Sequence, residues 1–290
     1  MKKHFYSPLR LIAFAIFFLV GFTLNTSAQS SFSGDTWNSV VQKGSGTLSV
    51  VYYEGTGMVR KEANGKMTGL CVDILNDFTK FVKTKYGKTI NVRYVHQEKD
   101  WSRFLELIAA SKNGVVGLSN ITITMSRKKK MGFTPPFITN PMIMLTNENA
   151  PKISNISELK STYKDYSAIV VKGTTHVNYA KAMQRVHNPN LNIIYGKTPA
   201  EIMDRTAKEK NLFAIIDMTE YYYAVHNKLP LKRQAVTVST NREKLGFALP
   251  KGTDWEVIWN EFLTPEYKKS ASYKQIISKN LGAQFTALIL

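Results

Sequence analysis

The alternation of short apolar segments with segments of helical spacing constrains the fold most. Residues 48–53, 90–95 and 115–124 read as strands in the first part of the chain. Apolar residues recur at helical spacing over 71–82 and 101–108, which predicts one helix between each pair of strands. Strands that alternate with helices in this way are typical of a parallel α/β sheet.

The same rhythm restarts after Pro141. The expected strands of this second part are 143–146, 168–171, 191–195, 213–216 and 245–249. The expected helices are a short one at Leu159 and those over 174–183, 199–208, 221–225, 255–262 and 273–281. A chain of this length has room for one large domain or for two lobes.

The N-terminus predicts export. Three basic residues precede an apolar run over 11–24, and small residues at 26–28 suit a cleavage site. At about 14 residues the run is short for a membrane span, which needs roughly 20, so we interpret residues 1–28 as a cleaved signal peptide. The alternative is an uncleaved N-terminal anchor helix. The Ser/Gly-rich residues 29–46 are expected to form a flexible leader, and the mature protein is expected in the periplasm.

The charge balance is strongly basic, with 39 Lys and Arg against 21 Asp and Glu and a formal net charge of +18. Such an excess is consistent with nucleic acid, an anionic membrane surface or anionic ligands as partners. Export argues against nucleic acid, and the run from Arg127 to Lys130 is the only four consecutive cations. We interpret the excess as general attraction to an anionic envelope.

No residue pattern predicts catalysis or a metal site. Cys71 is the only cysteine and lies in an apolar run, so a small buried side chain is expected there and no internal disulfide is possible. The five histidines show no paired ligand spacing. The expected catalytic residues, metal ligands and cofactors are therefore none.

Polar and charged residues mark the ends of three predicted strands. Thr122 and Arg127 stand at the end of the strand expected over 115–124. Residues 172–175 follow the strand expected over 168–171 and begin a helix, and Asp217 follows the strand expected over 213–216. Ligands of open α/β sheets bind beyond such strand ends, where a helix N-terminus favours an anion and a carboxylate suits an ammonium group. An ordinary helix cap for Asp217 and a solvated helix face for Arg127 remain alternatives.

Several segments, taken in order, resemble one family. The segments TITMSR and FTPPF (122–127 and 133–137) resemble the signature TITxxR…DFSxPY of extracytoplasmic solute-binding proteins for polar amino acids, family 3. Four further segments resemble other parts of that family's sequence: GKMTGLCVDI (65–74), VKGTT (171–175), ID (216–217) and LGFALPKG (245–252). The similarity runs from about residue 48 to 282.

The resemblance implies a two-lobed periplasmic-binding-protein-like α/β fold of type II, with discontinuous lobes joined by a two-strand hinge. Lobe 1 would consist of 47–140 plus 243–290, and lobe 2 of 141–242. The hinge crossovers are expected near 137–141 and 238–244.

The resemblance also implies a ligand site. Arg127 would hold an α-carboxylate through its planar guanidinium, with Thr122 adding a hydroxyl. Asp217 would pair with the ammonium, and Asn120 would add its backbone carbonyl. The remaining expected ligand-binding residues are Thr174, Thr175, Tyr53, Glu54 and Trp101. The aromatic and Pro-Pro-Phe motif that usually follows the family's first strand is absent, and Gly132 stands where the family often has Asp, so the ligand stays open.

The implied function is an exported, monomeric protein that captures an amino acid or similar small zwitterion and delivers it to an ABC-type importer permease, or to a sensor. It would be neither an enzyme nor a nucleic-acid-binding protein. Two alternatives are an enzyme on the same scaffold, similar to cyclohexadienyl dehydratase, and a ligand-sensing or adhesive envelope protein.

Overall fold

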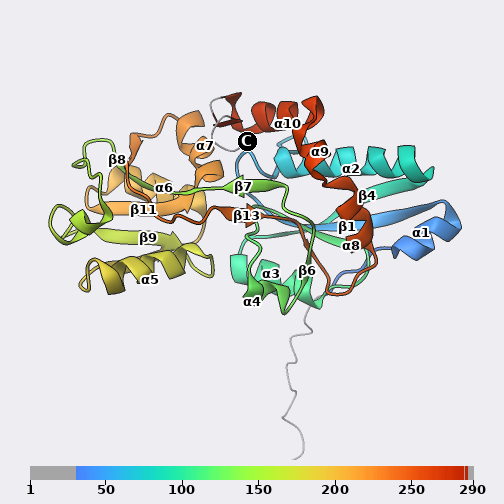
Figure 1. The fold of residues 1–290 in the computed structure, drawn as a ribbon, viewed down its shortest axis with the longest axis horizontal. Coiled ribbons are helices and arrows are strands. Elements are labelled where there is room, and N and C mark those ends of the chain that lie inside the picture. Colours follow the sequence, from blue (N-terminus) through green and yellow to red (C-terminus); the bar gives the residue numbers. More distant parts are fainter. Residues whose placement is uncertain (1–30, 284, 287–290) are drawn as a thin grey trace, which may run out of the picture. The chain divides into compact units, whose positions relative to one another are not determined.

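The computed structural model describes residues 31–283 and 285–286, and these form a mixed α/β structure with two five-stranded sheets (Figure 1). The predicted signal peptide, residues 1–28, lies outside the described residues. No helix within the described part of the chain is both long and apolar enough to cross a membrane.

The first sheet has the strand order β4-β1-β5-β14-β6. Its strands are β1 (Ser45–Tyr53), β4 (Thr89–Glu98), β5 (Val115–Leu118), β6 (Gly132–Phe133) and β14 (Ala248–Leu249). β1 runs parallel to β4 and β5, whereas β14 is antiparallel to β5. Two helices make the parallel connections, namely α2 (Leu70–Tyr86) and α3 (Trp101–Ala110). The predicted strand–helix rhythm of the first part is therefore confirmed.

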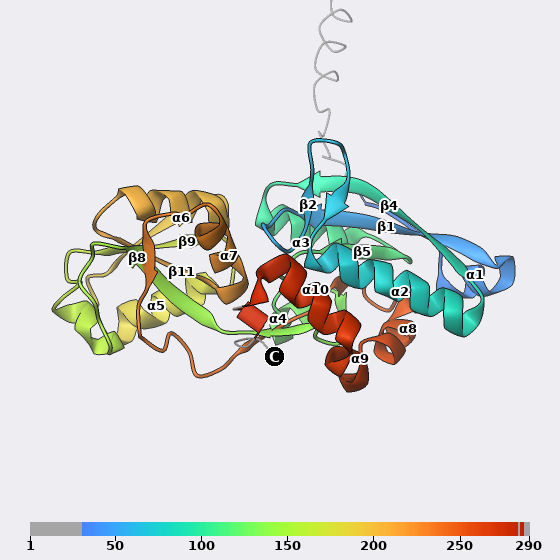
Figure 2. The same cartoon turned by 90° about the horizontal axis from the view of Figure 1, so that it is seen from above.

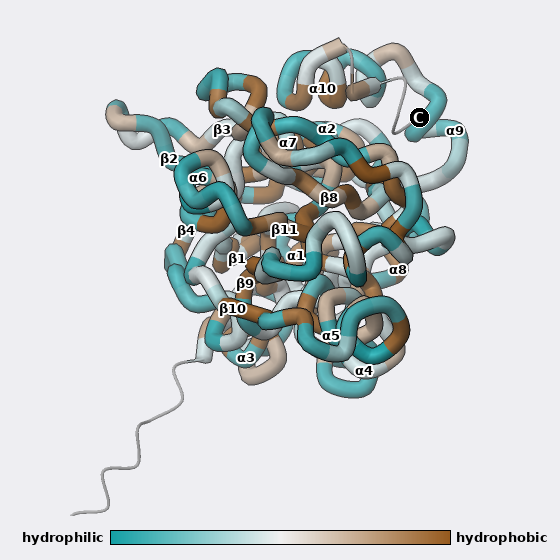
Figure 3. The backbone as a smooth tube through the Cα atoms, turned by 90° about the vertical axis from the view of Figure 1, so that its left-hand side faces the viewer, coloured by the Kyte–Doolittle hydropathy of each residue, from teal (hydrophilic) through white to brown (hydrophobic). Residues whose placement is uncertain are grey.

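The second sheet has the order β10-β9-β11-β8-β12. Its strands are β8 (Met142–Asn147), β9 (Ser167–Val171), β10 (Asn192–Gly196), β11 (Leu212–Asp217) and β12 (Leu231–Arg233). Its helices are α5 (His176–Val186), α6 (Pro199–Lys208), α7 (Met218–His226) and the 3-10 helix η1 (Ile156–Lys160). β9, β10 and β11 are parallel, and every residue of β11 is buried, as expected for a strand covered on both faces. Buried apolar residues of β8, β9 and β11 form the centre of this sheet, and apolar segments gather in the interior of the structure in Figure 3.

Two short antiparallel strands connect the sheets. β7 (Ile138–Asn140) carries the chain from the first sheet to the second, and β13 (Glu243–Leu245) returns it. The chain then adds β14 to the first sheet and ends in α8 (Trp255–Phe262), α9 (Pro265–Lys269) and α10 (Ala271–Leu281). α10 packs against α2, as Figure 2 also shows. The first sheet is thus discontinuous in sequence, while the exact lobe boundaries stay a prediction.

Two local expectations need correction. The leader is not loose over its described part, because α1 (Trp37–Lys43) is capped by Thr36 and anchored by hydrogen bonds from two of its backbone N–H groups to Asp254. The third predicted strand is also too long, since β5 ends at Leu118 and only an isolated bridge at Thr122 pairs with Leu245. In this segment Asn120 and Thr122 line a cavity, while Ile121 is buried in the core.

The remaining elements are short. They are the hairpin strands β2 (Arg60–Lys61) and β3 (Met67–Thr68), which enclose the predicted Asn64-Gly65 turn, and the helix α4 (Met125–Lys128). Gly65 adopts φ of 83°, a left-handed conformation that glycine reaches without steric cost.

Candidate functional site

The segment after β5 places Arg127. Thr124 caps α4 by accepting a hydrogen bond from the Arg127 backbone N–H at 3.2 Å. The Arg127 side chain turns back and donates from Nη1 to the Thr122 carbonyl at 2.8 Å. Its guanidinium carbon lies 5.5 Å from the centre of the Trp101 ring, within range of a cation–π contact. The first turn of α4 and an aromatic wall therefore hold this cation in one place.

Arg127 keeps most of its hydrogen-bonding capacity. A guanidinium carries five N–H donors, and one of them is used for the Thr122 carbonyl. No carboxylate oxygen of the described residues lies within 4.0 Å of it. Burial lowers the pKa of Arg127, and the more distant Glu243 and Asp217 oppose that effect. A partly desolvated cation with free donors is suited to an incoming anion.

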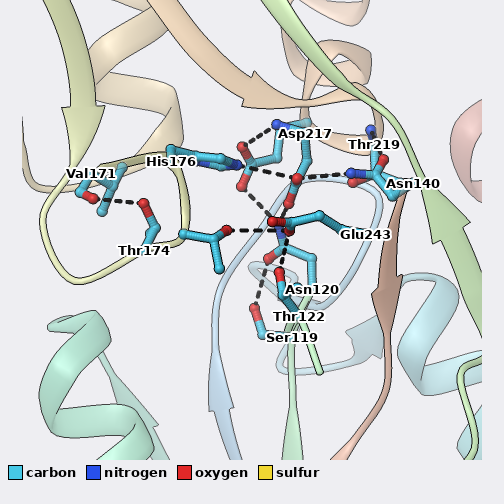
Figure 4. A network of polar contacts seen from close by, with 12 residues as sticks. Ser119, Asn120, Thr122, Asn140, Val171, Thr174, His176, Asp217, Thr219 and Glu243 are labelled. Atoms are coloured by element: carbon cyan, nitrogen blue, oxygen red, sulfur yellow. Dashed lines mark hydrogen bonds and ion pairs between the residues drawn. The ribbon is translucent and has the colours of Figure 1, made fainter. Parts of the chain in front are cut away.

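Asp217 is the last residue of β11 and the N-cap of α7, and its hydrogen bonding is nearly complete. Asp217 is 2% exposed and begins α7 in a capping box with Glu220. Its carboxylate accepts hydrogen bonds from the amides of Asn140 at 2.7 Å and Asn120 at 2.8 Å, and lies 3.2 Å from Nε2 of His176 (Figure 4). Asp217 thus holds together side chains from β7, β5–α4 and α5.

His176 and Glu220 have strongly shifted pKa values. Burial alone lowers the pKa of His176, but the Asp217 carboxylate outweighs burial and raises it to about 9. Burial and the neighbouring Asp217 charge raise the pKa of Glu220 to about 7. His176 is therefore a cation at neutral pH, while Glu220 gains or loses its proton near neutral pH.

Glu243 is a third buried carboxylate, and it comes from the connecting strand β13. It accepts hydrogen bonds from the hydroxyl of Thr122 and, at 3.2 Å, from the hydroxyl of Thr175 (Figure 4). Burial raises the pKa of Glu243, and Asp217 adds to that effect. Glu243 thereby links the end of the first sheet to the start of α5.

The β9–α5 turn comes close to the first sheet. Gly173 has φ of 81°, and a Cβ at this position would lie 2.5 Å from Oγ of Ser102 on α3. The hydroxyl of Thr174 closes the turn by donating to the Val171 carbonyl at 2.7 Å. The left-handed backbone conformation at position 173 favours glycine, and the close approach of Ser102 leaves little room for a side chain.

These elements enclose one small cavity of about 20 Å³, room for roughly one water molecule. Eight of the nine expected site residues line it, namely Tyr53, Trp101, Asn120, Thr122, Arg127, Thr174, Thr175 and Asp217. Tyr53, at the end of β1, donates its hydroxyl proton to the carbonyl of Lys197 at 3.1 Å, so the first sheet contacts the connection between β10 and α6.

The ninth expected residue, Glu54, lies in a neighbouring cavity of about 230 Å³. Asn120, Pro199 and Glu220 line both cavities, so the two adjoin. The structure thus brings eight expected residues together and places Glu54 next to them.

Sequence reasoning missed His176, Glu220, Glu243 and Asn140. Two of them had a usable signal: Glu220 stands three residues after Asp217 in a capping-box pattern, and Glu243 is the only acidic residue between Glu220 and Asp254. Nothing local distinguishes His176 or Asn140, because their role depends on contact with a distant Asp217. Within the described residues there is no group of three or more His, Cys, Asp or Glu side chains arranged to hold a metal.

Solved structures of similar fold are numerous. A candidate binding component of an ABC transporter from Wolinella succinogenes, complexed with lysine, is 19% identical with a TM-score of 0.66, covering 80% of this chain and 94% of its own. An ancestral amino-acid-binding protein, described as a precursor of cyclohexadienyl dehydratase, is 26% identical with a TM-score of 0.64, covering 84% and 98%. The GluR0 ligand-binding core with L-glutamate is 18% identical with a TM-score of 0.59, covering 83% and 97%.

These neighbours are type II periplasmic binding proteins with two lobes, which confirms the predicted fold class. A sequence model of the family described as "Bacterial extracellular solute-binding proteins, family 3" matches residues 51–283, most of the chain. The family that the motifs indicated is confirmed as well: this protein belongs to the bacterial extracellular solute-binding proteins, family 3.

Proposed function

We propose that this protein captures an amino acid or similar small zwitterion between its two sheets. One observation carries the proposal: Arg127, with most of its N–H donors free, lines the same cavity as the carboxylates of Asp217 and Glu220. Opposite charges that come from the two sheets and line one cavity match the two ends of a zwitterion.

The roles follow from this charge separation. The ligand's carboxylate binds the Arg127 guanidinium, beside the N-terminus of α5, whose dipole favours an anion. The ammonium group meets Asp217 and the Asn120 carbonyl, and Glu220 lies close to both. The hydroxyls of Thr122 and Thr175 already serve Glu243, so they reach the ligand only if that carboxylate yields them. Tyr53 and Trp101 form the aromatic wall.

Binding would proceed by opening and closing about the β7–β13 pair. The lobes are 47–140 plus 243–290 and 141–242, with the crossovers near 137–141 and 238–244 as the hinge. The cavity of about 20 Å³ is too small for a whole amino acid, so entry requires the lobes to part. Membership of an extracellular solute-binding family supports an exported, periplasmic protein. We propose that it works as a monomer and delivers its ligand to an ABC-type importer or a sensor.

A thermal-shift screen of the mature chain from Gln29 onward tests this function. The protein is scanned with each amino acid and with small organic acids that lack an amine. We expect the melting temperature to rise with at least one amino acid, because a ligand that binds only the folded state stabilises it. The proposal would be contradicted if no zwitterion raises the melting temperature and none binds in isothermal titration.

An enzyme on the same scaffold is the second candidate, favoured by one observation. Glu220 is a buried carboxylate in the cleft with its pKa raised to about 7, a value suited to proton transfer. Incubating the protein with cyclic acids of the type that dehydratases consume, and following product by absorbance, separates the two functions. Turnover that disappears in Glu220→Gln would favour the enzyme.

A further inference from the structure

The cavity beside the Arg127 clamp has a composition of its own. It measures about 230 Å³ and adjoins the smaller cavity through Asn120, Pro199 and Glu220. Its walls come from the β1–β2 connection on one side and from α6 and α7 on the other. The space for a ligand side chain is therefore here rather than at the clamp.

Two carboxylates in this cavity have no cationic partner. Glu54 accepts one hydrogen bond, from the Gln97 amide at 2.8 Å, and Glu220 accepts one from the Asn120 amide at 2.8 Å and a long one from the Asp217 backbone at 3.4 Å. Within the described part of the chain, no Lys, Arg or His nitrogen lies within 4.0 Å of either carboxylate.

The one cation lining the cavity is already paired. Arg60 makes a two-pronged contact with Glu62, donating from Nη2 to the two carboxylate oxygens at 2.7 and 2.9 Å. Both residues belong to the β2–β3 hairpin region, and Arg60 is exposed. Its charge is therefore largely neutralised locally and does not compensate the two carboxylates.

The rest of the lining suits an aliphatic chain. Met58 is buried on one side, and Pro199, Ala200 and Met203 present apolar atoms on the other. A flexible methionine on each side adapts readily to a methylene chain. The cavity therefore combines an apolar corridor with acidic groups.

A charge inventory of the whole site leads in the same direction. His176 is paired with Asp217 and Arg60 with Glu62, which leaves Arg127 as the one unpaired cation among the described lining residues. Glu54 and Glu220 line the cavities and make no ion pair, and neither does Glu243, which lies behind the lining residues Thr122 and Thr175. A neutral zwitterion matches Arg127 with its carboxylate and one acid with its ammonium. The remaining acids, of which Glu220 and Glu243 are buried and Glu54 is half-buried, then keep no counter-charge, which is unfavourable for the buried ones.

We propose that the ligand is a cationic amino acid, whose side-chain ammonium or guanidinium enters this second cavity and pairs with Glu54 and Glu220. This inference rests on the proposed function, since Arg127 must hold the α-carboxylate for the side chain to point there. The second positive charge compensates the surplus of carboxylates, and the apolar corridor packs the methylene stem. Glu220 also takes part in the cap of α7, so a substitution there would change both the fold and the binding. Glu54 has no such capping role, and the test therefore uses Glu54→Gln.

Isothermal titration of the mature protein with matched ligands tests the inference. L-lysine, L-ornithine and L-arginine are compared with L-norleucine, which has a similar stem and no side-chain charge, and with L-glutamine. We expect the affinity of the best cationic ligand to exceed that of norleucine by roughly 10-fold or more. Only the cationic side chain forms charged hydrogen bonds with the carboxylates of the cavity. Glu54→Gln should reduce that ratio by a similar factor, because it weakens the cationic ligands far more than norleucine.

Glu106→Gln is the matched control, because Glu106 lies on α3 with its side chain 61% exposed and lines neither cavity. It should leave the lysine-to-norleucine ratio as in the wild type. Norleucine or glutamine binding as tightly as all three cationic ligands would overturn the inference and leave the proposed function standing. An equal ratio in Glu54→Gln and the wild type would overturn it too. Failure of every amino acid to bind would overturn the proposed function itself.

Discussion

The β5–α4 and β11–α7 junctions have the same plan and opposite content. Each follows the carboxyl end of a strand, and each begins a helix whose first turn is capped by a side chain. Arg127, at the first junction, uses one of its donors, whereas Asp217, at the second, holds Asn120, Asn140 and His176. One junction presents an unsatisfied charge and the other a satisfied one.

This difference separates a group that is free for a ligand from one that also maintains the fold. Removing one partner of a buried charge pair costs much stability, because the other charge is left buried without compensation. A cation with free donors contributes little to the folded state, but it is available to a ligand at once. Substitutions at the two junctions should therefore affect different measurements.

The largest expected effect is that of Asp217→Ala on stability. The change leaves the buried His176 cation and the Asn120 and Asn140 amides without their acceptor, so the free energy of unfolding should fall by about 3–5 kcal/mol. Urea unfolding followed by circular dichroism measures it. The exposed Asp165→Ala is the control and should change the free energy of unfolding by less than about 0.5 kcal/mol. Equal losses in both variants would remove the contrast between the junctions.

Arg127→Ala should act mainly on ligand binding. Removing the guanidinium leaves the ligand's carboxylate desolvated without a partner, which typically costs about 2–5 kcal/mol, or roughly 30-fold to several thousand-fold in affinity. The free energy of unfolding should change far less than in Asp217→Ala, because the side chain makes one hydrogen bond. Titration of the ligand found in the thermal-shift screen checks the first part, and urea unfolding the second. A variant that binds like the wild type would exclude Arg127 from the clamp.

The satisfied junction should also give the ligand-free protein a pH-dependent stability. His176 has its pKa raised from 6.5 to about 9 in the folded protein, and Glu220 from 4.5 to about 7. In both cases the folded state retains a proton that the unfolded chain releases, so the free energy of unfolding should fall as pH rises, first from 4.5 to 7 and then from 6.5 to 9. Urea unfolding between pH 4.5 and 9 measures this slope.

Two variants assign the slope. Glu220→Gln should flatten the slope of the free energy of unfolding below pH 7. The control, His226→Gln at an exposed position, should leave the slope as in the wild type. A stability that rises between pH 6.5 and 9 would contradict the assignment of a His176 cation held by Asp217.

The smallest expected effect is that of Lys129→Ala, the matched control for Arg127. Lys129 is exposed two residues further along the same cationic run, and its side chain makes no ion pair among the described residues. Its removal should change ligand affinity less than about twofold, because exposed charges contribute under about 1 kcal/mol. Losses as large as those of Arg127→Ala would replace the clamp with a diffuse basic patch.

Much of the fold could be read from local patterns. The positions of β1, β4, β9, β10 and β11 and of their helices follow from apolar periodicity, which each segment carries within itself. The extent of β5 and the order in the leader could not be read in this way. β5 stops where its neighbours end, and α1 is ordered because Asp254, more than 200 residues away, accepts hydrogen bonds from its first turn.

The candidate site divides along the same line. The sequence by itself determined the family and the placement of Asp217 at a strand end and of Thr122 and Arg127 in the segment after a strand, because these residues occur in contiguous motifs with a fixed relation to strand and helix. Only the tertiary structure decided that Asp217 is saturated by Asn140 and His176, and that the unpaired acids outnumber the unpaired cations. Hydrogen bonds and burial depend on which distant segments meet, and a local pattern does not contain that information.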